Sequence, residues 1–584
     1  MMVLSARAEK PQDPLRFIPD HADLIVKIEN PRQLIKSVLG LEPVKQLLEM
    51  PAVQELYDST NSRRFYQLVA YFEKELGMKW EEIIDRLAGG GAALGVKLGP
   101  NPPIGAAIQG KDEDLLKKFV QLMSGVIDQE LGRQESRDKL QKAQYRNIAT
   151  YKVGELNAAA AGTALFLANS EKELQNVIDL HLDGKKNMTG VASLGEARQL
   201  LPASPLAWLW LNLDFVHNAP QAKEVFAQPR NDPQLTIFAG GLLDVVRRSS
   251  FICGAFNLNQ NRLVTTLRMP VGREGMPTEM AIHIPTTENQ GCLPLLEPQR
   301  VLLSTSYYAD LGKIWECRHK LFNTDQAKAF EDIDKKSGAF LLGNPVNKLL
   351  TQVGTHQRFV VVMDGTPGAI NSPEQIFSKL AFGITVDMRD PGFARAVETL
   401  VRAGGLLFRT QVKLTLVEEK YKDVTILGFR FPEADPKTVP PNGLGANLKF
   451  LIANGLTPSF AVAGNQIVLT SKLELCRELV DLVLEEAKAP AQDQSASDRT
   501  RFYSSGGSEL LKALGNQLFT QAILDRAVSP KEANEQIAQF IQWVGGLGAL
   551  DFETHYGAKD WRFDFTWSFS GKNKETKASP GPGK

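Results

Sequence analysis

Short apolar strands alternate with amphipathic helices along most of the chain. Residues 22–29 combine β-branched side chains with partial alternation, a pattern that predicts a strand. Asn30 and Pro31 follow as the start of a helix, because proline is well tolerated at the first helical position. Leu34 and Val38 then place apolar side chains on one face of that helix. The pattern therefore predicts a strand that leads directly into an amphipathic helix.

The order of the predicted elements indicates the fold class. Single helices separate short pairs of strands, and the regular strand-helix-strand spacing of parallel sheets is absent. Strands that follow each other closely pair most simply as antiparallel neighbours. We therefore predict an α+β fold in which helices pack on one face of an antiparallel sheet, and we do not expect a doubly wound parallel fold.

The two halves of the chain carry matching segments. Residues 162–180 align without a gap with residues 464–482, and each segment reads as a strand followed by a helix. Four further matches keep the same order along the chain: Pro19 with Pro298, residues 105–112 with 383–390, Tyr145 with Tyr421, and residues 239–242 with 544–547. Between the tyrosine pair and residues 464–482 the offset jumps once, and one insertion of roughly 25 residues would account for it.

We interpret these matches as a tandem duplication of one α+β module. Two unrelated domains of the same class are the alternative. The predicted segments are a signal-peptide remnant or disordered start (1–14), a first half (15–290), a second half (293–570) with an inserted loop (about 430–460) and a linker (about 488–500), and a disordered tail (571–584).

Composition limits the classes of function. The 584 residues include 67 Lys and Arg and 67 Asp and Glu, so no whole-chain attraction to nucleic acid or to an anionic membrane is expected. No apolar run is long enough for a transmembrane helix. The four cysteines are widely spaced and form no CxxC pair, so we expect neither a disulfide scaffold nor a zinc site. Cys476 falls opposite Leu174 in the repeated helix, which predicts a buried thiol.

The N-terminus indicates a compartment. Residues 5–8 end in the small-x-small pattern that signal peptidase recognises, and a polar, proline-containing segment follows. Only Met1 to Leu4 precede the pattern, whereas a signal peptide needs an apolar stretch of about 7 to 15 residues. Either the start is truncated or the pattern is accidental. From the pattern itself we expect an extracytoplasmic location, in the periplasm or cell envelope, with a cytoplasmic location as the alternative.

Two glycine-rich segments resemble nucleotide-binding loops. Residues 105–111 satisfy most of the phosphate-loop pattern, but Asp112 stands where such a loop needs Ser or Thr, and the supposed loop reads as an apolar strand. Residues 88–97 do not fit the dinucleotide fingerprint and read instead as a helix end followed by a strand. We predict no nucleotide site and no cofactor.

No recognised catalytic or metal-binding motif is present. Cys317 and His319 stand two residues apart on a predicted helix, where they would point to different faces. Glu81, Glu82 and Asp85 form a carboxylate cluster that reads as a solvated helix face. We therefore predict no catalytic residue and no metal ligand.

The most unusual local pattern is an alternating aromatic strand near the C-terminus. Strict alternation places five aromatic side chains on one side of that strand: Trp561, Phe563, Phe565, Trp567 and Phe569. They could line a face for an apolar ligand, or they could form a final core strand under helices. The matching strand of the first half, residues 262–268, has no aromatic residue, so a ligand role would belong to the second half alone.

Four segments together carry a resemblance to a known family: residues 17–30, 76–84, 87–90 and 145–148. The first half resembles a family of large bacterial proteins, common in planctomycetes and cyanobacteria, that is known only as a domain of unknown function. The similarity covers most of residues 15 to 290 and, more loosely, the second half. It implies an export signal and transfers no catalytic residue.

Three functions of different classes remain after this reading. The leading hypothesis is a non-enzymatic, exported binding or scaffolding protein of the bacterial cell envelope or periplasm, with a protein or an apolar ligand as its partner. The second is a carrier of lipid or of another apolar ligand, which would use the aromatic strand. The third is a hydrolase whose residues converge only in three dimensions.

Overall fold

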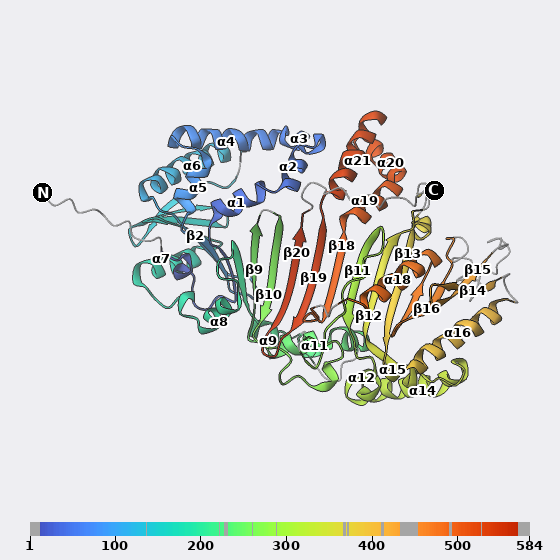
Figure 1. Cartoon of the computed structure of the whole chain (residues 1–584). Coiled ribbons are helices and arrows are strands. Elements are labelled where there is room, and N and C mark those ends of the chain that lie inside the picture. Colours follow the sequence, from blue (N-terminus) through green and yellow to red (C-terminus); the bar gives the residue numbers. More distant parts are fainter. Residues whose placement is uncertain are drawn as a thin grey trace. The chain divides into compact units, whose positions relative to one another are not determined.

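The structure is a computed structural model that describes residues 12–135, 137–220, 222–226, 232–259, 261–287, 289–365, 370, 373–409, 414–431, 454–489, 493–526 and 528–569. The chain divides into two compact units. Unit 1 comprises residues 1–222 and 249–270, and unit 2 comprises residues 223–248 and 271–584. The predicted α+β class and the antiparallel strand pairing are confirmed (Figure 1).

Unit 1 contains the first ten strands. They are β1 (Leu24–Ile28), β2 (Gly91–Val96), β3 (Ile104–Gln109), β4 (Gln141–Tyr145), β5 (Ile148–Val153), β6 (Leu156–Ala161), β7 (Ala164–Ala168), β8 (Ala207–Asn212), β9 (Phe251–Asn259) and β10 (Arg262–Met269). Its helices are η1 (Pro14–Phe17), α1 (Pro31–Leu39), α2 (Glu42–Leu48), α3 (Pro51–Tyr57), α4 (Thr60–Leu76), α5 (Trp80–Ala88), α6 (Glu113–Arg133), α7 (Glu171–Asp183), η2 (Met188–Gly190), α8 (Ala192–Leu200) and α9 (Asp214–Asn218). Helix α10 (Ala222–Phe226) lies at the boundary of the units.

The strands of unit 1 form one antiparallel sheet in the order β4-β5-β6-β7-β3-β2-β1-β8-β9-β10. One face of this sheet is buried under helices. There Phe166 packs with Ile178 of α7, and Cys253 packs with Ala197 of α8. Burial alternates along β1, as expected for a strand with one face in the core.

Local sequence explains where the helices begin. The Asn30 side chain accepts a hydrogen bond from the Gln33 amide, and Pro31 occupies the first turn of α1, as predicted. Ser170 caps α7 in the same way, and Gly184 ends that helix in the left-handed conformation that glycine adopts without strain.

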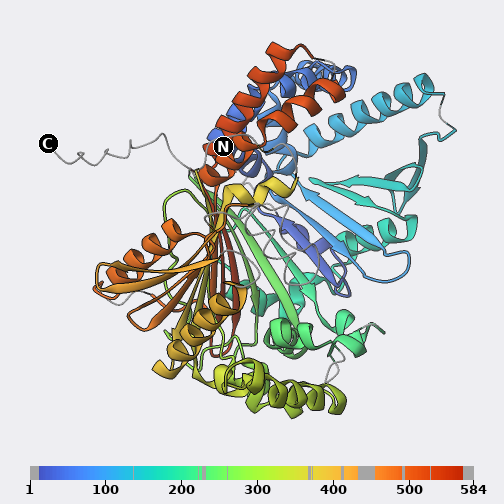
Figure 2. The ribbon, with the colours of Figure 1, turned by 90° about the vertical axis from the view of Figure 1, so that its right-hand side faces the viewer.

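Unit 2 contains the other ten strands. They are β11 (Val301–Tyr308), β12 (Val353–Met363), β13 (Leu380–Met388), β14 (Thr415–Tyr421), β15 (Val424–Arg430), β16 (Ser459–Ala463), β17 (Gln466–Thr470), β18 (Asp498–Tyr503), β19 (Ala549–Tyr556) and β20 (Trp561–Ser568). Its helices are α11 (Pro233–Arg248), η3 (Thr278–Met280), α12 (Gly312–Glu316), α13 (Arg318–Leu321), α14 (Thr324–Phe340), α15 (Val346–Gln352), η4 (Pro373–Lys379), α16 (Pro391–Arg409), α18 (Leu473–Glu486), α19 (Ser504–Ala513), α20 (Gly515–Arg526) and α21 (Pro530–Gly545). In Figure 2, α12 to α15 gather at one end of the strands of unit 2, and α19 to α21 gather at the other end.

The strands of unit 2 pair in the order β14-β15-β16-β17-β13-β12-β11-β18-β19-β20, and every pair is antiparallel. Helix α18 packs on one face of this sheet, against Val468, while α16 packs on the other face, near Ile467. The expectation of helices on one face only is therefore wrong for unit 2. Strands β15 to β17 carry apolar residues on both faces, and both faces must then be covered.

The strands of the two units follow the same order, and the pairing registers correspond. Gly105 faces Ala168 in unit 1, as Gly383 faces Thr470 in unit 2. These are the positions that the sequence alignment matches.

Several predicted segments lie partly or wholly outside the described residues. Most of the inserted loop (430–460), most of the N-terminal segment (1–14) and the C-terminal tail (571–584) are of this kind. The predicted linker (488–500) runs into β18, which begins at Asp498.

Candidate functional site

The predicted aromatic residues lie on β20 and immediately after it. Trp561 is buried, whereas Phe563, Phe565, Trp567 and Phe569 are partly exposed. Trp567 donates a hydrogen bond from Nε1 to the Leu547 carbonyl oxygen at 2.7 Å, and its ring meets that of Phe569 at 4.7 Å. We call the side of the unit 2 sheet that carries Phe563, Phe565 and Trp567 the aromatic face.

The aromatic face continues from β20 across the sheet. Residues directly opposite each other on antiparallel strands point to the same side. The row that starts at Phe565 runs through Phe552, Thr500, Thr305, Phe359, Ile384 and Leu469. Apolar side chains therefore occupy both ends of this row, and two threonines occupy its centre, where their hydroxyl oxygens lie 2.6 Å apart.

Ring contacts join the aromatic residues into two groups. Around Phe552, the ring centroids of Phe565, Phe502 and Phe563 lie at 5.1, 5.9 and 6.3 Å. On β12 and β13, Phe359 stacks on Phe382 at 6.4 Å. The sequence analysis did not single out the partners on β12, β13, β18 and β19, because only strand pairing brings them next to β20.

An apolar cleft opens on the same face beside α16. Its volume is about 270 Å³. It is lined by Phe382, Ile384, Val401, Phe429, Pro458, Ser459, Phe460, Leu469, Thr470 and Ser471. Ile384 is 41% exposed, which is unusual for isoleucine in the middle of a long strand.

The hydroxyl groups of this cleft are already engaged with the backbone. Ser459 donates to the Thr457 carbonyl oxygen, and Thr470 donates to that of Lys472. The Ser471 hydroxyl accepts a hydrogen bond from the Phe382 amide. The cleft therefore presents hydrocarbon, with no ionisable side chain in its lining.

One carboxylate stands at the end of the aromatic face. Asp498 begins β18 and lies between Tyr307 on β11 and Thr554 on β19, which in turn faces Phe563. Burial raises the pKa of Asp498, and a hydrogen bond with Thr554 works in the opposite direction. Burial also raises the pKa of Tyr307. Sequence reasoning placed Asp498 in a linker and missed it.

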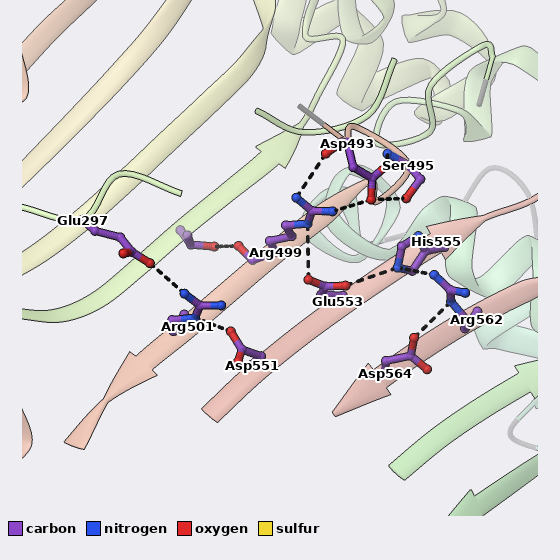
Figure 3. A network of polar contacts seen from close by, with 11 residues as sticks. Glu297, Asp493, Ser495, Arg499, Arg501, Asp551, Glu553, His555, Arg562 and Asp564 are labelled. Atoms are coloured by element: carbon purple, nitrogen blue, oxygen red, sulfur yellow. Dashed lines mark hydrogen bonds and ion pairs between the residues drawn. The ribbon is translucent and has the colours of Figure 1, made fainter. Parts of the chain in front are cut away.

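The opposite face of β18 to β20 carries a chain of ion pairs (Figure 3). Arg499 contacts Glu553 at 3.3 Å, and Arg501 contacts Asp551 and, at 2.7 Å, Glu297. The network continues with three further contacts: Glu553 to His555 at 3.5 Å, His555 to Arg562 at 2.8 Å, and Arg562 to Asp564 at 3.1 Å. Each acidic group in this network contacts a basic one, so we interpret the network as a paired structural surface.

The corresponding strands of unit 1 have the opposite polarity. Strands β8 and β9 hold the places in sheet order that β18 and β19 hold in unit 2. Their helix-covered side carries Trp208, Trp210, Cys253 and Ala255, which pack near α8. By register, these positions match Arg499, Arg501, Asp551 and Glu553. The described residues between α18 and β18 form no helix comparable to α8, and in unit 2 that side is charged.

Comparisons with known proteins give little further information. No protein-family model matches the chain, and no curated protein matches it. Among solved structures, crystal forms III and I of a protein designated TP0453 are similar at a TM-score of 0.25. Their sequence identities are 10% and 11%, and the alignments cover 48% of this chain and 89% and 88% of the other. At that score the similarity supports no conclusion about fold or function. The resemblance to the bacterial family remains a prediction.

The rejected phosphate-loop candidate is an ordinary strand. Residues 104–109 form β3, and Lys111 pairs with Asp85 at 3.1 Å. Helix α5 ends at Ala88 and β2 begins at Gly91, as the glycine-rich segment predicted. In the carboxylate cluster, Glu81 and Glu82 are exposed, which confirms a solvated face for these two residues, whereas Asp85 is half-buried by its ion pair with Lys111.

The other candidates give no reactive constellation. Burial raises the pKa of the Cys317 thiol, and His319 contacts Glu331 at 3.2 Å rather than this cysteine. A groove of about 620 Å³ is lined by His319 and by Glu331 of α14. The Glu331 carboxylate is also paired with Arg318, at 2.9 Å, so it is not free to act as an acid or base with His319. Cys476 lies on the buried side of α18, as predicted, and its pKa is raised to about 12 by burial.

Searches for metal and membrane features concern the described residues alone. Within them, no three or more His, Cys, Asp or Glu side chains are grouped to hold a metal ion. None of the helices in this part of the chain has both the length and the apolar character needed to cross a membrane.

Proposed function

We propose that the protein is a binding protein that holds an apolar ligand, such as a lipid chain, on the aromatic face of unit 2. The observation that carries this proposal is the cleft beside α16, whose side chains present hydrocarbon and whose hydroxyls are engaged with the backbone. A hydrocarbon chain laid there would gain about 25 cal/mol for each Å² of apolar surface removed from water. No catalytic role is needed for this activity.

The polarity of β18 to β20 favours a ligand over a simple core strand. In unit 1 the apolar side of the corresponding strands is the side near α8. In unit 2 the aromatic side chains are on the other side, where Phe502 is 43% exposed. Half-exposed aromatic residues in a continuous face are typical of surfaces that bind something apolar. Because the chain has no net charge, the ligand is held by contact rather than by long-range attraction.

A polar substitution in the cleft tests this proposal. Ile384→Asn should weaken binding of N-phenyl-1-naphthylamine by roughly tenfold, because an amide would be desolvated without a partner. Ile333→Asn is the matched control: Ile333 is 56% exposed on α14 and is absent from the cleft lining. Native mass spectrometry of the protein, purified without detergent, should also reveal a bound apolar compound. The proposal fails if the protein binds neither probe nor lipid, or if the two variants bind the probe equally well.

We also propose that the protein is exported to the periplasm or cell envelope, together with the family of bacterial proteins it resembles. The support is the small-x-small pattern at residues 5–8. Cell fractionation followed by N-terminal sequencing of the mature chain tests it. A cytoplasmic protein that retains Met1 or Met2 would contradict export.

We further propose that the two halves of the chain, residues 15–290 and 293–570, descend from one duplicated module. Their common strand order and corresponding registers support this, and so do matching details. Arg146 and Lys422, which follow the aligned tyrosines, both adopt a positive φ, and so do Gly162 and Gly464. An experimental structure in which the two units did not superpose would contradict it.

A further inference from the structure

We propose that the ligand of the aromatic face carries an ammonium group, and that Asp498 and the aromatic rings around it bind this group. This inference rests on the proposed function and names the ligand class: an alkylammonium amphiphile. Its hydrocarbon chain would lie along the aromatic face, and its cationic head would lie at the end where β18 begins.

The position of Asp498 is the first support. It belongs to the row Val386, Gln357, Tyr307, Asp498, Thr554 and Phe563, two residues along each strand from the row that contains Ile384 and Phe565. In the described parts of β11 to β13 and β17 to β20, it is the one Asp or Glu on the aromatic face, and no Lys or Arg accompanies it there. A charged head at this point would leave the rest of the face to an apolar chain.

The absence of a counterion is the second support. Each acid shown on the opposite face of β18 to β20 has a basic partner, as Glu553 has Arg499 and Asp551 has Arg501. Asp498 has no ion pair within the described residues, and its hydrogen-bond partner is the neutral Thr554. The nearby charges of His555 and Glu553 act on its pKa in opposite directions. A buried carboxylate is costly without a cation. A bound ammonium group would supply that cation.

The aromatic surroundings are the third support. Tyr307 is directly opposite Asp498, and Phe563 follows Thr554 in the same row. Trp561 stacks on Phe563 with ring centroids 6.3 Å apart and planes 8° apart. Tyr556 faces Trp561 and interacts electrostatically with Asp498. Aromatic rings beside a carboxylate form the environment that binds ammonium groups, because the ring faces attract cations.

A series of head groups on one chain length tests the inference. Dodecylamine, dodecyltrimethylammonium, dodecanol and dodecanoate would compete with N-phenyl-1-naphthylamine for the full-length protein below their micelle concentrations. We expect the two ammonium compounds to displace the probe at concentrations at least tenfold lower than dodecanol, and dodecanoate to be the weakest. Their ranking distinguishes a primary from a quaternary ammonium ligand.

Two variants locate the effect. Asp498→Asn, which keeps the shape and removes the charge, should lower the affinity for the ammonium compounds to that for dodecanol and leave dodecanol binding unchanged. Phe563→Leu should weaken dodecyltrimethylammonium more than dodecanol. Far-ultraviolet circular dichroism reports whether each variant is folded, and the wild-type head-group series decides the matter if Asp498→Asn does not fold.

The outcomes separate this inference from the function on which it rests. If all four compounds bind equally well, the apolar binding function stands and the ammonium site is wrong. If none displaces the probe, or if the probe itself does not bind, both proposals fail. Ammonium selectivity that survives in Asp498→Asn would also overturn the assignment of this carboxylate.

Discussion

At the scale of single residues, Arg358 is the largest fully buried side chain in the part of the chain that the structure describes. It is 1% exposed, and its guanidinium donates to the Thr385 hydroxyl, the Pro294 carbonyl oxygen, the Glu486 carboxylate and the Gln466 side chain. The 2.7 Å contact with Glu486 ties β12 to the last turn of α18. A planar group with several donors suits this position better than a lysine ammonium would.

Removing this guanidinium should destabilise unit 2. Arg358→Leu leaves Glu486 without its partner, and breaking a buried pair in this way costs about 3 kcal/mol. Arg358→Lys keeps the charge but loses most of the hydrogen bonds, so its free energy of unfolding should lie between those of Arg358→Leu and the wild type. Urea denaturation followed by tryptophan fluorescence measures both. An Arg358→Leu midpoint equal to that of the wild type would contradict the assigned role.

The pKa of Asp498 leads to a prediction about pH. Burial raises this pKa above the unfolded value, so the folded state holds the proton more tightly than the unfolded chain does. The stability linked to this proton is fully present below the unfolded pKa of about 4 and is lost as pH rises through the folded pKa. The pH range of this loss also depends on neighbouring titratable groups. Those that interact electrostatically with the Asp498 carboxyl are His555, Glu553, Tyr556 and Cys292.

Asp498→Asn mimics the protonated acid at every pH. As pH rises from about 4 through the folded pKa, the wild type should therefore lose stability relative to the variant. The free energy of unfolding of the variant minus that of the wild type should increase over this range. Urea titrations of both proteins at a series of pH values measure this difference. A difference that stays constant, or that shrinks with rising pH, would show that the carboxyl is not destabilised by burial.

At the scale of elements, α19 approaches β11 through a glycine. A Cβ atom on Gly506 would lie 2.5 Å from the Val301 carbonyl oxygen and 2.8 Å from the Leu302 Cα atom. The neighbouring Gly507 has only one atom within 4 Å of such a Cβ, at 3.9 Å. The two positions share a helix and a residue type but differ in their distance from the sheet.

Alanine substitutions at these two glycines should have opposite effects. Gly506→Ala forces the backbone of α19 away from β11 and should cost about 2 kcal/mol or more. Gly507→Ala should stabilise the helix by up to about 1 kcal/mol, because alanine is the better helix former. Thermal denaturation of the two variants provides the comparison. If both substitutions stabilise the protein, α19 does not pack closely on the strand.

The local sequence pattern predicted individual strands and helices better than it predicted which strands pair in the sheet. The strand and helix expected in residues 162–180 are β7 and α7, and those in 464–482 are β17 and α18, because periodicity and caps act over a few residues. The aromatic face could not be assembled in this way. Thr305 and Thr500 meet across nearly two hundred residues, and only that pairing connects Phe359 with Phe552. Asp498 was likewise hidden by its polar surroundings in sequence.

At the scale of the whole chain, the two units share a strand order but differ in what their sheets bury. In unit 1 the chain runs from α7 to β8, and in unit 2 it runs from α18 to β18. Among the described residues, a further helix, α8, stands before the strand in unit 1 alone. Where α8 covers the sheet, the strands carry tryptophan and cysteine. Where it is missing, they carry paired charges, and the aromatic residues occupy the other face. The presence or absence of this one covering helix therefore goes together with the side of the sheet on which the apolar side chains lie.

The proposed common ancestry also predicts parallel responses to equivalent substitutions. Tyr145 donates a hydrogen bond to Asp179 at 3.3 Å, and Tyr421 donates to Asp481 at 2.8 Å; the sequence alignment matches these pairs. Tyr145→Phe and Tyr421→Phe should each lower the denaturation midpoint slightly. The double variant should show the sum of the two effects, because the residues lie in separate units. Differential scanning calorimetry of the three variants tests this. A loss confined to one tyrosine would mean that the two contacts differ in role despite their matching positions.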